Sequence, residues 1–170
     1  MSKNLKIIGV VILTINLIIA INLLSTKTFQ NAQASQLQQN LQESQILELV
    51  NLERSKNGIQ PLIINPQLVQ SAQLKTRDML DHNYFGHIGN GGQKWSDFIV
   101  NSGYNYTISG ENLAKNYTDS RSTVQAWMNS TTHRDNILNK DFEETGIALS
   151  GGIIDNQSII LITQQFGSQP

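Results

Sequence analysis

The stretch TGIALSGGIIDNQSIILITQQF, residues 145–166, decides the fold class of this chain. Its two ends, TGIALS (residues 145–150) and SIILITQQF (residues 158–166), are apolar and rich in β-branched side chains. The GGIIDN segment between them carries turn residues. Two β-branched runs joined by glycine, aspartate and asparagine are typical of an antiparallel hairpin. The stretch therefore predicts two paired strands near the C-terminal end of the chain.

Upstream of this hairpin, the apolar residues repeat at helical spacing. Ile46 and Val50 lie on one face of a predicted helix, with Leu49 beside them, and Gly58 is suited to end that helix in a left-handed conformation. Asn65 then supplies an N-cap for a second helix that runs to about residue 82. One stripe of this second helix is expected to be buried: Val69, Ala72, Thr76, Met79 and Leu80.

Shorter helical patterns follow at residues 95–103, 124–128 and 133–138. The tryptophans at the start of the first pattern and within the second, Trp95 and Trp127, are expected in the core. A series of helices followed by strands indicates an α+β fold, in which helices pack on an antiparallel sheet.

The composition excludes several classes of function. The 170 residues are enough for one domain with a hydrophobic core. The formal net charge is −1 and there is no basic run, so nucleic acid is not an expected partner. The chain has no cysteine, which excludes disulfides, thiol catalysis and thiolate metal sites.

The N-terminal residues are typical of an export signal. Lys3 and Lys6 precede an apolar run at residues 7–24, and Ala32 and Ala34 form a small-x-small cleavage site. We expect residues 1–34 to be a signal peptide cleaved after Ala34. A membrane span needs about 20 apolar residues, and the run at residues 7–24 is close to this length. An uncleaved signal anchor is therefore the alternative. Only this alternative implies contact with a membrane.

Both alternatives place the remaining chain in a secreted, extracellular or periplasmic location. The segment at residues 35–45 is rich in glutamine and is predicted to be a linker. Residues 46–168 then form the folded domain.

Three histidines and one glutamate are the candidate functional residues. His82 ends the second helix, His87 closes the segment NYFGH, and His133 lies in the first turn of the short helix after WMNSTT. Glu111, in SGENLA, is open to three interpretations: an internal helix cap, an arginine partner, or a carboxylate that lines a cleft. A lone histidine is more often structural than functional. No G-x-S-x-G or H-E-x-x-H hydrolase motif is present, and spacing alone does not join these residues into a site.

The order of the segments, however, resembles a known family. NYFGH, GENLA, WMNSTTHRDNIL, FEETGIAL and TQQFG follow one another within residues 42–167. This series is similar to the CAP superfamily of cysteine-rich secretory, antigen 5 and pathogenesis-related 1 proteins, and especially to its bacterial, cysteine-free SCP-domain branch. The resemblance implies a three-layer α-β-α sandwich with an antiparallel central sheet. It also implies a central cleft with two histidines and two acidic residues.

Carried over by motif, the resemblance implies that His87 and His133 are the two cleft histidines and the metal ligands. Glu111 is then the first acidic residue. The second acidic residue has no match, because the segment after the aromatic residue of the fourth helix reads WMNS. Glu143 and Glu144 are the candidates to replace it.

The resemblance implies no settled activity. Two neutral imidazoles are fewer than the three protein ligands usual for catalytic zinc, so we expect a weak, exchangeable Zn²⁺ site. We expect an extracellular module that binds a peptide, a lipid or a cell-wall component. The alternative is a metal-assisted, peptidase-like hydrolase with Glu111 as general base. The missing nucleophile and second carboxylate favour binding over catalysis.

Overall fold

The computed structural model describes residues 19, 21–27, 41–89 and 91–170. The chain divides into two units, residues 1–39 and 40–170. In the first unit, residues 19 and 21–27 are helical. Within the described residues, no helix combines the length and the apolar character that a membrane crossing requires. The predicted cleavage site after Ala34, most of the signal segment and residues 35–40 of the linker lie outside the described residues.

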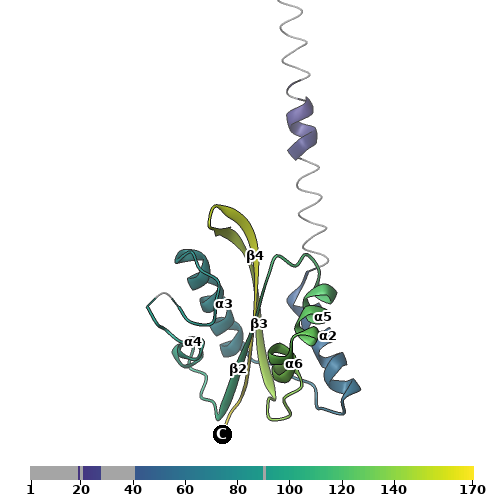
Figure 1. The fold of residues 1–170 in the computed structure, drawn as a ribbon, viewed down its shortest axis with the longest axis vertical. Coiled ribbons are helices and arrows are strands. Elements are labelled where there is room, and N and C mark those ends of the chain that lie inside the picture. The colour runs from purple at the N-terminus through teal and green to yellow at the C-terminus, as the bar shows by residue number, and fades with distance from the viewer. Residues whose placement is uncertain (1–18, 20, 28–40, 90) are drawn as a thin grey trace, which may run out of the picture. The chain divides into compact units, whose positions relative to one another are not determined.

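The second unit is a three-layer sandwich around a four-stranded sheet (Figure 1). The strands have the order β1-β3-β4-β2, with bounds β1 (Ile63–Ile64), β2 (Ile108–Lys115), β3 (Glu144–Ile154) and β4 (Gln157–Ser168). One face is covered by α3 (Pro66–Asp81) and α4 (Trp95–Asn101). The other face is covered by α2 (Glu43–Lys56), α5 (Ser120–Asn129) and α6 (Thr131–Ile137). The α+β class and the α-β-α layering are therefore confirmed.

The C-terminal hairpin is longer than the sequence indicates. β3 pairs antiparallel with β4 over the whole length of β3, from Glu144 opposite Gly167 to Ile154 opposite Gln157. The turn consists of Asp155 and Asn156 alone, which have φ values of 51° and 61°. Two consecutive residues at positive φ are the conformation that the right-handed twist of a hairpin favours. Residues 151–154, which were predicted to be part of the turn, belong to β3 instead.

Two strands were not predicted. β2 pairs antiparallel with β4 at one edge of the sheet, and β1 pairs parallel with the first two residues of β3 at the other edge. β1 is thus an exception to the antiparallel sheet that we expected. The β2 sequence, ISGENLAK, has the glycine and asparagine that strands usually avoid. Its extended conformation depends on its pairing with β4, which no local pattern reveals.

The ends of the first two long helices follow from local chemistry. Asn65 caps α3, because its side-chain oxygen accepts a hydrogen bond of 2.9 Å from the backbone N–H of Gln67. Gly58, at φ 68°, follows the end of α2 as predicted. α2 begins at Glu43, so residues 43–45, predicted to be linker, form its first turn. Leu41 just before it is 7% exposed and belongs to the core.

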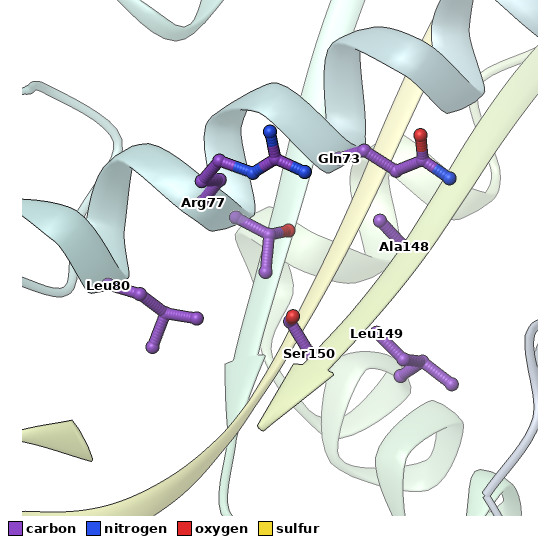
Figure 2. Close-up of a pocket in the computed structure, with 7 residues that line it drawn as sticks. Gln73, Arg77, Leu80, Ala148, Leu149 and Ser150 are labelled. Carbon is purple, nitrogen blue, oxygen red and sulfur yellow. The ribbon is translucent and has the colours of Figure 1, made fainter. Parts of the chain in front are cut away.

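The buried face of α3 is rotated from the predicted stripe. Leu68 and Lys75 are fully buried, whereas Val69 and Leu80 are partly exposed. The cause is a close approach of the helix to the sheet, since a Cβ on Gly146 of β3 would lie 2.0 Å from the backbone carbon of Leu68. Leu80 lines a pocket between α3 and β3 (Figure 2), where a Cβ on Gly152 would lie 2.5 Å from its Cδ2.

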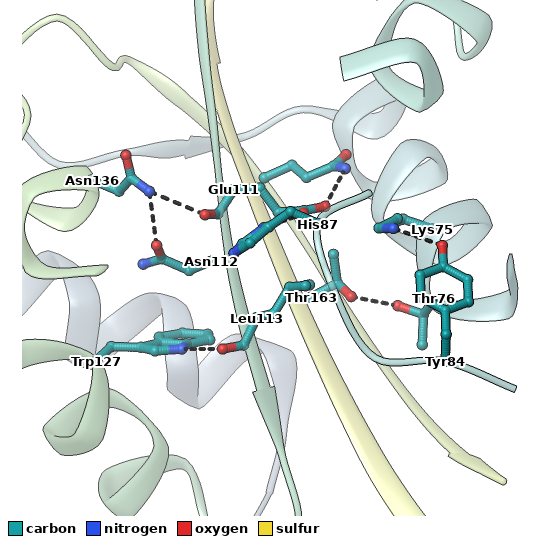
Figure 3. A network of polar contacts seen from close by, with 11 residues as sticks. Lys75, Thr76, Tyr84, His87, Glu111, Asn112, Leu113, Trp127, Asn136 and Thr163 are labelled. Carbon is teal, nitrogen blue, oxygen red and sulfur yellow. Dashed lines mark hydrogen bonds and ion pairs between the residues drawn. The ribbon is translucent and has the colours of Figure 1, made fainter. Parts of the chain in front are cut away.

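The outer edge of β2 is covered by side chains of α5 and α6 (Figure 3). Alternate residues of an antiparallel edge strand direct their backbone groups away from the sheet. The carbonyl of Leu113 accepts a hydrogen bond of 3.1 Å from Trp127 Nε1, and that of Glu111 accepts one of 3.1 Å from Asn136 Nδ2. Trp127 is 1% exposed, which confirms its predicted place in the core. These contacts hold α5 and α6 against the strand that carries Glu111.

Candidate functional site

A cleft of about 280 Å³ beside β2 brings the predicted residues together. It is formed by the loop after α3, the start of α4, β2 and α6. The lining residues are His87, Trp95, Ser109, Gly110, Glu111, Thr132, His133 and Asn136. His82 lies outside this cleft, at the end of α3, where it pairs with Asp78.

His87 and Glu111 form the first pair of the cleft (Figure 3). His87 Nδ1 donates to Glu111 Oε1 at 2.7 Å. The second carboxylate oxygen, Oε2, accepts a hydrogen bond of 3.1 Å from Gln165 Nε2. The Glu111 side chain is 1% exposed, so these partners replace the water that a buried carboxylate needs. Glu111 is therefore neither a helix cap nor an arginine partner.

The loop that carries His87 is anchored to α3 through Tyr84. The Tyr84 hydroxyl donates to Asp78 Oδ2 and accepts a hydrogen bond of 2.8 Å from Lys75 Nζ. Burial lowers the pKa of the Lys75 ammonium group, and the negative charges of Glu111 and Asp78 oppose this effect. Burial and the hydrogen bond to Asp78 raise the pKa of Tyr84, which keeps the phenol protonated. A buried cation thus helps to balance the buried carboxylate of the cleft.

His133 forms the second pair of the cleft with Ser130. Its Nδ1 is 2.8 Å from Ser130 Oγ, which lies at the N-cap of α6. Its backbone carbonyl accepts a hydrogen bond of 3.1 Å from Asn112 Nδ2. Burial, and then the nearby His87, lower the pKa of His133. The neutral imidazole is therefore favoured at ordinary pH.

The second acidic residue of the family pattern is absent from this cleft. Glu144 accepts hydrogen bonds from the Tyr104 hydroxyl at 2.6 Å and from Asn65 Nδ2 at 3.0 Å. Neither Glu143 nor Glu144 lines the cleft. The Ser130 hydroxyl instead partners the second histidine, so the hypothesis that Glu143 or Glu144 substitutes is wrong. Glu144 begins β3 and Glu143 directly precedes it, and neither position faces the cleft.

Several residues at the cleft were not predicted from the sequence. Trp95, predicted to be buried, is only partly buried and lines the cleft. Asn136 Nδ2 contacts the carbonyl of Glu111 and, at 2.9 Å, Asn112 Oδ1. Asn112 lies in the segment GENLA and Asn136 in the segment THRDNIL. Both segments carried the family resemblance, so the resemblance is the signal that would have identified these asparagines. No periodicity marks them, because their partners lie on other elements.

The cleft offers two imidazole nitrogens, Nε2 of His87 and Nε2 of His133, that could hold a divalent metal. Each histidine is held through Nδ1, and within the described part of the chain no hydrogen bond engages Nε2 of either ring. No group of three or more histidine, cysteine, aspartate or glutamate side chains that could hold a metal occurs among those residues. Two imidazole nitrogens alone can coordinate Zn²⁺ weakly, with the remaining positions left to solvent or ligand. Glu111 orients one of these rings, as carboxylates behind histidine ligands commonly do.

The part of the sequence that matches known proteins lies within the folded domain. The model of the cysteine-rich secretory protein family, CAP, matches residues 47–163. The uncharacterized protein YkwD of Bacillus subtilis (strain 168) is 41% identical over 124 residues, which cover 73% of this chain and 46% of YkwD. The uncharacterized membrane protein YlbC of the same organism is 32% identical over 111 residues, covering 65% of this chain and 32% of YlbC.

Solved structures show the same likeness. An extracellular protein containing a SCP domain from Bacillus anthracis str. Ames has 30% identity and a TM-score of 0.64, over 74% of this chain and 40% of that one. An outer surface protein from Borrelia burgdorferi has 21% identity and a TM-score of 0.65, over 73% and 90% of the two chains, a likeness of fold alone. The chain spans less than half the length of YkwD, YlbC and the B. anthracis protein.

Proposed function

The chain belongs to the cysteine-rich secretory protein family, CAP, and on this premise we propose that it is an extracellular binding module. Its cleft would bind a ligand or partner through His87, His133 and a weakly held Zn²⁺ ion. The observation that carries this proposal is the arrangement of the two rings: each is anchored through Nδ1, and no described residue bonds its Nε2. The extracellular setting is supported by the B. anthracis relative, which is described as an extracellular protein.

The protonation of the cleft favours metal binding. A histidine ligates a metal only in its neutral form, and the lowered pKa of His133 extends that form to lower pH than is usual. The carboxylate of Glu111 accepts the Nδ1 proton of His87, which leaves the lone pair on Nε2. When bound, Zn²⁺ would supply a Lewis acid for an oxygen donor of the ligand. A peptide, a lipid or a cell-wall fragment could each provide such an oxygen.

The hydrolase alternative is less well supported. It requires Glu111 to take a proton from water, yet both of its oxygens already accept hydrogen bonds from protein side chains. Its side chain is 1% exposed, so a water molecule would have to displace one of these partners. Glu111 is placed to hold His87 in position, which a binding site needs as much as a catalytic one.

Titration calorimetry with ZnCl₂ tests the metal site. Either His87→Ala or His133→Ala should abolish most of the Zn²⁺ binding, and the double variant should lose little more, because the two rings act as one unit. His82→Ala is the matched control, since His82 is exposed and lies outside the cleft. Full Zn²⁺ affinity in the double variant would remove the metal from the proposal.

A second variant tests the role assigned to Glu111. Glu111→Gln should weaken Zn²⁺ binding by about 10- to 100-fold, the usual effect of removing the carboxylate behind a histidine ligand. Binding of peptides, wall fragments and lipids to the full chain, with and without Zn²⁺, then identifies the ligand class. Hydrolysis of any of these that disappears in Glu111→Gln while binding persists would favour the enzyme over the binding module.

A further inference from the structure

The two edges of the sheet differ in how they are covered. In β2, the outward carbonyls of Leu113 and Glu111 accept hydrogen bonds from Trp127 and Asn136, so side chains of α5 and α6 cover part of that edge. At the opposite edge, β1 pairs only with Glu144 and Thr145, the first two residues of β3. Among the residues that the structure describes, the rest of β3 has a sheet neighbour on one side only.

The direction of the free backbone groups follows from the pairing. The carbonyl of Thr145 accepts a hydrogen bond of 2.9 Å from the backbone N–H of Asn65, so Thr145 faces outward. Because β3 and β4 pair without a bulge, every second residue after it also directs its N–H and C=O outward. The residues with such outward groups are Ile147, which is 2% exposed, and the more accessible Leu149, Gly151 and Ile153. No hydrogen bond to these groups occurs within the residues that the structure describes.

This edge lacks the usual features that prevent strand addition. Natural edge strands are protected by proline, by lysine, by bulges or by a covering element. Residues 147–153 read IALSGGI, with no proline, no charged residue and no bulge. Ile153 is 65% exposed, and the two glycines before it allow another backbone to approach closely.

A pocket of about 390 Å³ lies beside the open edge, between α3 and β3 (Figure 2). Its lining residues are Gln73, Thr76, Arg77, Leu80, Ala148, Leu149 and Ser150. Figure 2 shows the side chains of Gln73 and Arg77 extending from α3, with that of Gln73 above Ala148 of β3. Arg77 is exposed and has no ion pair or hydrogen bond with any described residue. The pocket therefore presents an unpaired positive charge next to a row of unpaired backbone groups.

We propose that this edge is a docking site for an extended peptide segment of a partner protein, which pairs with β3 as an added strand. An acidic side chain of the segment pairs with Arg77. Backbone hydrogen bonds supply affinity in this mode of recognition, and pockets for alternate side chains supply specificity. Every second side chain of an added strand falls on the α3 side of the sheet, within reach of the pocket. A guanidinium group binds a carboxylate in a bidentate geometry, so an aspartate or glutamate is the matching residue.

This site is separate from the histidine cleft. The cleft is built on β2, and the open strand is β3, at the opposite edge of the sheet. The two sites share no lining residue. The docking proposal therefore does not depend on the metal site or on the function proposed for the cleft.

Two peptide probes test the docking site by NMR titration of the ¹⁵N-labelled full chain. The first is a capped nonapeptide of alternating threonine and valine with one central glutamate, and the second carries lysine at that position. The glutamate peptide should shift the amide signals of Leu149, Gly151 and Ile153 in a saturable manner. Equal binding of the lysine peptide, or shifts elsewhere with none at these amides, would overturn the proposal. Concentration-dependent shifts of the same amides without peptide would identify a second copy of the chain as the occupant and would also overturn it.

Variants of the edge and of the pocket separate backbone pairing from charge pairing. Gly151→Pro removes one outward N–H and should abolish binding, whereas Gly151→Ala retains it, since a Cβ there meets only the carbonyl of Ile159 at 3.9 Å. Arg77→Gln should weaken the glutamate peptide by about two- to fivefold, as expected for an exposed ion pair. Lys140→Gln, which removes an exposed charge elsewhere, should leave binding unchanged. If Gly151→Pro fails to fold, the Arg77 and Lys140 variants still decide, because equal affinities of the two would contradict the proposal.

Discussion

Replacement of Gly146 by alanine should displace α3 from the sheet. A Cβ at this position would lie 2.0 Å from the backbone carbon of Leu68, 2.2 Å from the nitrogen of Val69 and 2.4 Å from the Leu68 carbonyl oxygen. Ordinary contacts begin near 3.4 Å, so the helix and the strand would have to separate by more than an ångström. All three atoms belong to the helix backbone, and no side-chain rotation can relieve the overlap.

The expected loss of stability is large. Extra methylene groups in a packed core typically cost about 1–3 kcal/mol, mostly through side chains that adjust. Here the whole of α3 must shift, which also strains the buried hydrogen bond of 2.8 Å between Thr76 and Thr163. We therefore expect a loss of about 3 kcal/mol or more, out of a total free energy of unfolding of about 5–15 kcal/mol for a domain.

Urea unfolding of the full chain measures this loss. Gly151→Ala is the matched control in the same strand, because its Cβ meets only one atom within 4 Å, at 3.9 Å. That variant should be unchanged or more stable by up to about 1 kcal/mol, since alanine loses less chain entropy than glycine. If the two variants unfold within about 0.5 kcal/mol of each other, as ordinary surface substitutions do, the close approach of α3 to β3 is not what positions the helix.

Two further predictions concern α5 and α6. Trp127→Ala should lower the free energy of unfolding by about 3–5 kcal/mol, because Trp127 is 1% exposed. His133→Ala should have much less effect. Equal losses of stability in thermal melts of the two variants would make His133 a core residue. Asp119→Ala should cost about 1 kcal/mol at neutral pH, because Asp119 caps α5 through Ser122. These hydrogen bonds lower the pKa of Asp119, so the contribution of the charge is present above about pH 4 and is lost as the pH falls through the lowered pKa. Asp119→Asn keeps a neutral cap, and urea unfolding at several pH values should show that only the wild type loses this increment in acid.

The sequence predicted the elements whose signals are local. The cap at Asn65, the left-handed Gly58 and the C-terminal hairpin depend on residues within a few positions of one another. The motif order predicted that His87, Glu111 and His133 belong to one site, and the structure places all three in one cleft. Composition excluded thiol chemistry and disulfides, because the chain has no cysteine.

Other features were not predictable, because their partners are distant in the chain. Arg54 is 1% exposed, and its guanidinium group donates hydrogen bonds to the carbonyls of Gln60, Ile137, Asn139 and Phe142. Nothing in the local pattern of α2 distinguishes this arginine from a solvated one. Lys75 is likewise fully buried on a helix whose sequence would allow it to face water.

What the sequence alone determined is therefore the α+β class, the main helices, the hairpin and the histidine–glutamate set. These follow from periodicity, from turn and cap chemistry, and from the order of motifs. Only the tertiary structure decided that Glu111 bonds His87 and Gln165, that Ser130 replaces a carboxylate at His133, and that β3 is left open beyond β1. The physical reason is that a hydrogen-bond partner or an uncovered strand edge is defined by which elements meet in space, and that meeting depends on the packing of the whole domain.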